Sequence, residues 1–162
     1  MKKLALTLVG SCIFAGLFAQ KDLTTAQKSF QTSMVNFLRE EGYSPSLDDD
    51  NWIKFKSEGK TYYITIGEES PFFVTLRAAG FTLQGENAFE RTASLLACND
   101  LTMEFKSVKL YCSDKSVSVH VEQFTRSSED YKYVFARNLS VLTAAKNKFF
   151  EKYSKWKEEL EK

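Results

Sequence analysis

The chain has 162 residues, of which 22 are Lys or Arg and 21 are Asp or Glu, so its formal net charge at pH 7 is +1. This near balance excludes a general electrostatic attraction to nucleic acid or to anionic lipid, and the length fits a single domain. Aromatic residues make up 14% of the sequence, which is enough to build a packed core without disulfide or metal staples.

The first nineteen residues predict a signal peptide that is not part of the fold. Lys2 and Lys3 precede an uncharged apolar run over 4–18, which is short for a membrane-spanning helix. Ala19 supplies the small residue that a cleavage site needs, so we expect an exported protein, periplasmic or secreted. Two alternatives stay open, a lipid anchor on Cys12 and an anchor that is not cleaved.

Residues 20–162 then form one α+β domain, with helices on one face of an antiparallel sheet of about five strands. The expected order is α-β-β-β-α-β-β-α. Thr24 and Gln27 form a capping box at the start of the first helix, which ends at Gly42. Three strands follow, over 51–57, 60–66 and 71–79, and Glu58-Gly59 marks a hairpin turn between the first two.

The second half predicts a helix over 88–98, a hairpin within 105–124 and a long C-terminal helix over 127–160. The helix over 88–98 has an apolar face of Ala88, Phe89, Thr92, Leu95 and Leu96. The C-terminal helix is longer than a domain of this size needs. Its end is either a frayed charged extension of a core helix or an oligomer contact in a homodimer, through Phe149, Tyr153 and Trp156.

Cys112 and the single histidine, His120, lie in the hairpin within 105–124 and are the first candidates for catalysis. Side chains alternate between the two faces of a strand, so Cys112 points inward with Leu110, whereas His120 points outward. The sheet would then separate the thiol from the imidazole, which argues against a catalytic pair. Cys98 falls on the flank of its helix, and a Cys98–Cys112 disulfide is left open.

Two further stretches resemble known ligand-binding motifs but lack features that those motifs require. The stretch "EGKT" at 58–61 lacks the earlier glycine and the following helix of a phosphate-binding loop, and "DDDN" at 48–51 lacks the ligand spacing of a calcium loop. One histidine and no Cys-x-x-Cys leave few ligands for a transition metal. We expect no catalytic residues, no metal site and no cofactor.

The same alternation places large aromatic side chains on the outward face of the sheet, where a solvated face would be polar. The inward set is Ile53, Phe55, Tyr62, Ile64, Ile66, Phe72, Val74 and Leu76, and the outward set is Trp52, Lys54, Tyr63, Thr65, Phe73, Arg77, Tyr111, His120, Glu122 and Phe124. Either a helix or loop covers these outward aromatics, or they form a binding surface. The candidate binding residues are Trp52, Tyr63, Phe73, Tyr111, His120 and Phe124.

The element order and local patterns resemble the YbjN-like family of sensory-transduction regulators, whose fold is like that of type III secretion chaperones. The matching stretches are "DDDNWIKFKSEGKTYYITI", "PFFVTL", "ACNDLTMEFKSVKLYC" and "SVSVHVEQF", and together they lie within 24–150. The resemblance implies a non-enzymatic module that can dimerise and hold a partner segment. It brings no catalytic residues. A signal peptide departs from the cytoplasmic setting of secretion chaperones.

The sequence therefore predicts an exported, non-enzymatic binding module that captures a protein or peptide, with no affinity for nucleic acid. The alternative is a carrier of a small apolar ligand held between the helices and the sheet. An enzyme of another type would need convergent polar side chains in a pocket, and the inward positions are apolar.

Overall fold

The computed structural model of the chain describes residues 22–82, 88–113 and 116–162. The predicted signal peptide over 1–19, including Cys12, lies outside the described residues. Of the helices in the described ranges, none is both long enough and apolar enough to cross a bilayer.

The fold class is α+β, as predicted, with an antiparallel sheet and a long C-terminal helix. The three helices are α1 (Thr25–Glu40), α2 (Ala88–Glu104) and α3 (Ser128–Leu160). The strands are β1 (Ser46–Leu47), β2 (Ile53–Ser57), β3 (Lys60–Ile66), β4 (Phe72–Ala78), β5 (Phe81–Thr82), β6 (Val108–Cys112) and β7 (Ser116–Thr125).

The seven strand segments make a sheet that is six strands wide, against the predicted five. The order is β1-β2-β3-β4-β7-β6, and β5 pairs with β7 beyond the end of β4, on the same side of β7. The prediction missed β1 and β5 because each has only two residues, too few to show an alternating pattern. Each of these short strands forms only because it pairs with another strand, β1 with β2 and β5 with β7.

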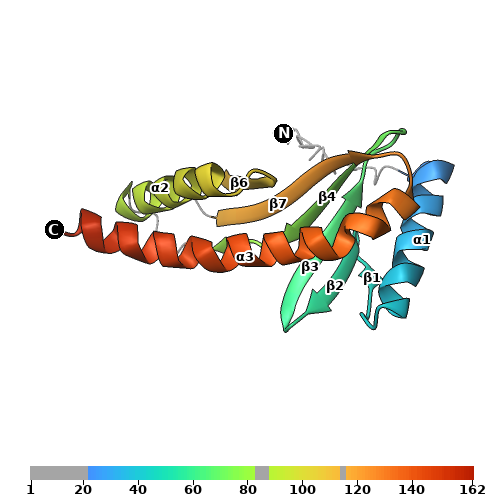
Figure 1. Cartoon of the computed structure of the whole chain (residues 1–162), viewed down its shortest axis with the longest axis horizontal. Helices are drawn as coiled ribbons and strands as arrows, with labels where there is room; N and C mark the ends of the chain where they lie inside the picture. Colours follow the sequence, from blue (N-terminus) through green and yellow to red (C-terminus); the bar gives the residue numbers. More distant parts are fainter. Residues whose placement is uncertain (1–21, 83–87, 114–115) are drawn as a thin grey trace, which may run out of the picture.

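All three helices bury residues against one face of the sheet, which we call the inner face (Figure 1). The main core cluster joins inward strand residues such as Ile53, Ile64 and Leu76, each fully buried, to Met34 of α1 and Leu142 of α3. The predicted inward set is confirmed, with Ile66 only partly buried.

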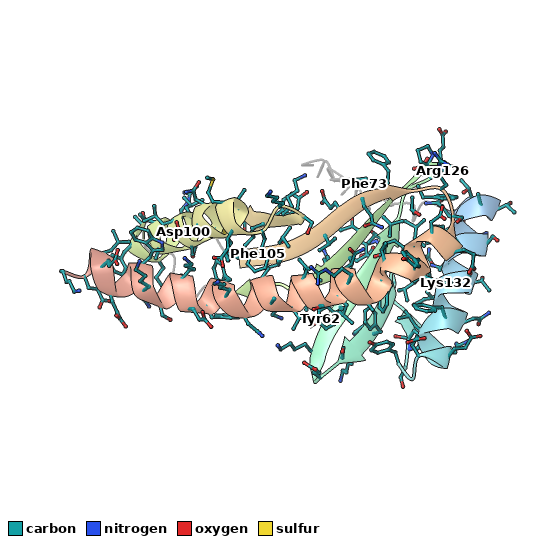
Figure 2. The ribbon with its side chains drawn as sticks, in the orientation of Figure 1. Tyr62, Phe73, Asp100, Phe105, Arg126 and Lys132 are labelled. Carbon is teal, nitrogen blue, oxygen red and sulfur yellow. The ribbon has the colours of Figure 1, made fainter. Side chains whose placement is uncertain are left out.

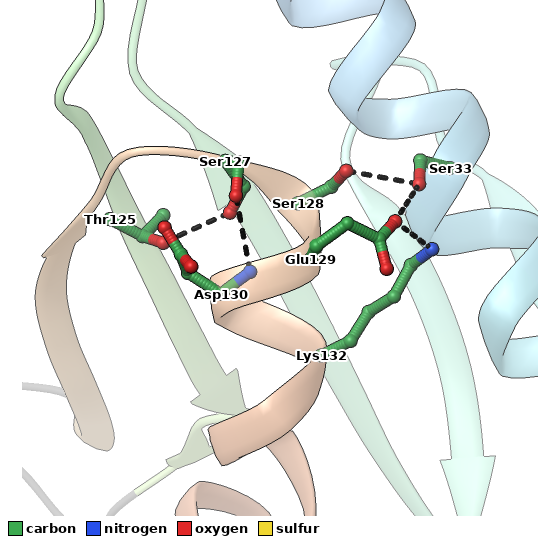
Figure 3. Close-up of polar contacts among 7 residues, drawn as sticks. All are labelled: Ser33, Thr125, Ser127, Ser128, Glu129, Asp130 and Lys132. Carbon is green, nitrogen blue, oxygen red and sulfur yellow. Dashed lines mark hydrogen bonds and ion pairs between the residues drawn. The ribbon is translucent and has the colours of Figure 1, made fainter.

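Local capping fixes where α1 and α3 begin. The predicted capping box of Thr24 and Gln27 is present at the start of α1. The Ser127 side chain accepts a hydrogen bond from the backbone N–H of Asp130 at 3.2 Å, which caps α3. Ser128 donates to Ser33 of α1 at 3.0 Å, so the cap of α3 is also joined to α1 (Figure 3).

The far half of α3 extends beyond the sheet and is covered by α2 (Figure 1). The predicted apolar face of the second helix is wrong: Leu95 is exposed, whereas Ala93, Ala97 and Leu101 are fully buried. These residues stand four apart on one side of α2, and the two alanines allow the helix axes to approach closely. The sequence interpretation favoured the largest apolar side chains and so chose the wrong side. The helix also continues past Cys98 to Glu104.

The three residues named as a possible subunit contact all pack against α2 within the chain. Phe149 is fully buried in a second core cluster with α2, and Tyr153 and Trp156 pack against that cluster. The Trp156 indole donates to Asp100 of α2 at 3.0 Å. Phe149 therefore offers no surface to a second subunit, and α2 explains the long apolar stripe of α3 without a dimer.

Candidate functional site

The sheet face away from the helices, which we call the outer face, carries a row of side chains that crosses five strands. Lys54 pairs with Tyr63, Tyr63 with Arg77, Arg77 with His120, and His120 with Lys109. Neighbouring strands lie about 4.8 Å apart, so the row spans about 19 Å. Neither buried core cluster includes any of these five residues.

Arg77 lies near the middle of the row and contacts two aromatic rings. Its guanidinium carbon lies 4.1 Å from the centroid of the Trp52 ring and 5.0 Å from that of Tyr63. The two rings themselves meet edge to face at 6.2 Å. Among the basic residues described on the outer face, only Arg77 contacts two aromatic rings. Its Nε is buried and has no hydrogen-bond partner.

A second cluster surrounds His120 on β7. Its Nε2 lies 2.9 Å from the Ser118 hydroxyl, its Nδ1 lies 3.7 Å from Glu122, and its ring centroid lies 4.5 Å from that of Tyr111. The Tyr111 hydroxyl donates to Glu122 at 2.7 Å, and Lys109 donates to the other carboxylate oxygen at 3.1 Å.

The environment sets the charges of this cluster. Burial lowers the pKa of His120 to about 4, and the positive charges of Arg77 and Lys109 add to that effect against the pull of Glu122. The pKa of Glu122 is also lowered, because the hydrogen bonds from Tyr111 and Lys109 outweigh its burial. At neutral pH the cluster therefore holds a neutral imidazole beside a paired carboxylate.

Ser118, His120 and Glu122 occur in the order hydroxyl, imidazole, carboxylate, which is the arrangement of a nucleophile, base and orienting acid. Two observations speak against that use. The carboxylate is 3.7 Å from Nδ1, beyond hydrogen-bond distance, and its nearer oxygen already accepts from Tyr111. A base with a pKa of about 4 is also poorly matched to proton abstraction near pH 7.

The third aromatic group lies at the end of β4 and β7 nearest the start of α3. The rings of Phe73 and Phe124 are 5.2 Å apart, and the residues are 40% and 70% exposed. Figure 2 shows Phe73 projecting from the strands away from α3. A surface pocket of about 480 Å³ beside Phe124 is lined also by Pro71, Arg126 and Val134.

The predicted separation of Cys112 and His120 is confirmed. Cys112 packs with the inner-face cluster that contains Cys98, whereas His120 contacts only outer-face side chains among the described residues. Cys98 was expected on a helix flank but is buried, and its side chain is hydrogen-bonded to Cys112. Both are thiols, not a disulfide. Burial and the neighbouring sulfur raise the pKa of Cys98 to about 12.

The structure thus groups the six predicted binding residues into three clusters on one face: Trp52 with Tyr63, Tyr111 with His120, and Phe73 with Phe124. The prediction did not select Lys56, Lys109 and Ser118, although the same alternation places them outward. Within the described ranges, no group of three or more His, Cys, Asp and Glu residues is placed to hold a metal ion.

The space between the helices and the inner face, expected as the alternative site for an apolar ligand, is occupied by the buried side chains of the two core clusters. No protein-family model matches the chain, and no curated protein or solved structure matches it either. The resemblance to the YbjN-like family therefore rests on the quoted stretches alone.

Proposed function

We propose that the protein is an exported, non-enzymatic binding module that captures a protein or peptide partner on the outer face of its sheet. The observation that carries this proposal is the outer face itself. It presents five aromatic side chains (Trp52, Tyr63, Phe73, Tyr111 and Phe124) that the core clusters leave out. Aromatic side chains with exposed edges are the usual anchors of protein interfaces.

A chaperone-like or regulatory role in the cell envelope agrees with a YbjN-like fold and with the predicted signal peptide. The described helices pack on the inner face, so none of them covers the outer face. Exposed apolar side chains surrounded by charged residues are typical of a binding surface. A face that only contacts water is expected to carry polar side chains instead.

Site-specific photocrosslinking in the cells that produce the protein tests this proposal. A photoreactive phenylalanine replaces Phe124, which is 70% exposed on the outer face, or Tyr133, which is 91% exposed on α3 and serves as the matched control. We expect a discrete protein adduct from position 124 and none from position 133. Adducts of equal yield from both positions, or none from position 124, would contradict a partner on the outer face.

A further inference from the structure

The charges of the outer face are unbalanced although those of the whole chain are not. Strand residues on this face include four cations, Lys54, Lys56, Arg77 and Lys109, but only one carboxylate, Glu122. The excess is local, because the formal net charge of the whole chain is only +1.

The single carboxylate is already used. Glu122 is bound by Lys109 at 3.1 Å and by the Tyr111 hydroxyl at 2.7 Å, so that end of the row is neutralised. In the described part of the chain, Lys54, Lys56 and Arg77 have no acidic partner. They form a triangle of uncompensated positive charge over β2, β3 and β4.

The triangle surrounds aromatic surface. Tyr63 lies between Lys54 and Arg77 in the row, and the Trp52 ring also contacts the Arg77 guanidinium, with the two rings edge to face. These rings hold the guanidinium in place, and no acidic residue described in the fold forms an ion pair with it. Its Nε is buried without a hydrogen-bond partner, so a ligand would reach the two terminal nitrogens. A guanidinium fixed in this way is well suited to bind a carboxylate in two-pronged geometry.

We infer that the outer face binds an acidic, extended peptide segment that crosses β2, β3 and β4 with its carboxylates on Lys54 and Arg77. This inference rests on the proposed function of the outer face. Lys54 and Arg77 stand two strands apart, which is about 9.6 Å. In an extended segment of polyproline II type, residues three apart lie on the same side of the chain and are separated by about 9.3 Å, so acidic residues at positions i and i+3 match the two cations.

A single-stranded nucleic acid would also offer negative charge and stacking bases. The peptide is favoured because the positive region is small and flanked by a neutralised carboxylate, and because the nearly neutral chain provides no long-range attraction to a polyanion.

The test measures the fluorescence anisotropy of a labelled peptide that carries Glu at every third position and an aromatic residue between. We expect binding that weakens as salt rises from about 50 to about 300 mM. A peptide with Gln in place of each Glu should bind at least about tenfold more weakly, the usual effect of losing charge-assisted hydrogen bonds.

Variants locate the binding. Arg77→Gln should weaken binding about ten- to hundredfold. Because Arg77 also packs on two rings, the double variant Lys54→Gln/Lys56→Gln provides a second test. Lys54 is half-buried and Lys56 exposed, and neither belongs to a core cluster, so the variant should fold and should weaken binding about tenfold or more. Lys28→Gln, an exposed lysine on α1, removes the same charge elsewhere and should leave affinity unchanged.

The inference would be overturned by equal binding of the Gln peptide, by binding that the Lys54→Gln/Lys56→Gln variant retains, or by tighter binding of oligothymidylate than of the acidic peptide. Absence of binding by the acidic peptide would also overturn it. A crosslink at position 124 that persists in that case keeps the proposed function and rejects only the acidic partner.

Discussion

The two faces of the sheet contain aromatic residues in similar abundance but use them differently. On the inner face the Phe55 ring contacts both Tyr62 and Phe135 within a closed cluster, and the Tyr62 hydroxyl pairs with Thr143 of α3 at 2.8 Å. On the outer face the rings stand in separate pairs beside cations, as Trp52 does with Arg77. The comparison shows that the surroundings of an aromatic residue, rather than its presence, distinguish a folding core from a candidate interface.

The largest expected effect comes from opening the inner face. Phe135→Ala removes a ring that is 2% exposed and contacts Phe37, Tyr43 and Phe55. We expect a loss of about 3–5 kcal/mol in the free energy of unfolding, measured by urea denaturation. Phe124→Ala on the outer face is the matched control and should change it by less than about 0.5 kcal/mol. Similar losses in both variants would remove the distinction between the faces.

A comparable loss is expected where α2 covers α3. Phe149→Ala leaves a cavity at a fully buried site and should cost about 3 kcal/mol. The oligomeric state should not change, because Phe149 is enclosed within one chain. Light scattering coupled to gel filtration checks this. A dimer that the substitution dissociates would return this residue to the role of a subunit contact.

A smaller effect is expected from the cation–aromatic contact on the outer face. Trp52→Ala removes the ring 4.1 Å from the Arg77 guanidinium and should cost about 1–2 kcal/mol. Trp52→Phe keeps a ring there and should recover most of that stability. Thermal denaturation of both variants measures the difference, and equal losses would show that ring stacking on Arg77 contributes little.

The pH dependence of stability reports on the His120 cluster. In the unfolded chain histidine takes a proton near pH 6.5, whereas burial in the fold lowers the pKa of His120 to about 4. Between these values the unfolded state binds more protons, so stability falls as the pH drops from 6.5 toward 4. After allowing for solvent screening we expect a loss of about 1 kcal/mol.

His120→Gln is the control for that prediction, because the chain has no other histidine. Its free energy of unfolding should be flatter between pH 6.5 and pH 5 than that of the parent, when both are measured by urea titration. Identical slopes would mean that the imidazole is solvated in the fold.

The smallest effect concerns the thiols. Cys98 is buried and its pKa is raised to about 12, so iodoacetamide at pH 8 should modify Cys112 well before Cys98. Peptide mass spectrometry separates the two sites, and urea should remove the difference. Faster modification of Cys98 would contradict its burial between α2 and the inner face.

Strand alternation could be predicted from the sequence because a period of two is a local property. It gave the inward set and the position of His120 opposite Cys112 correctly. It could not give β1 or β5, which exist through pairing with other strands. Nor could it give the buried side of α2, where the small residues Ala93 and Ala97 are buried because α3 lies against them.

The candidate site was predictable as a list of outward residues but not as clusters. The register that brings Lys54, Arg77 and His120 into one row depends on three strand pairings, which no local pattern specifies. The imbalance of charge on the outer face appears only once that register is known, because the sequence as a whole is nearly neutral.

We propose that partners bind the outer face, whereas the far half of α3 contributes to folding by packing against α2. The chain contains two tryptophans, Trp52 on the outer face and Trp156, whose indole is bonded to Asp100 of α2. Two-dimensional ¹H–¹⁵N NMR during titration with the acidic peptide follows both indole N–H signals at once. We predict that the Trp52 signal moves with peptide concentration and that the Trp156 signal stays in place. Movement of the Trp156 signal with a fixed Trp52 signal would contradict binding at the outer face.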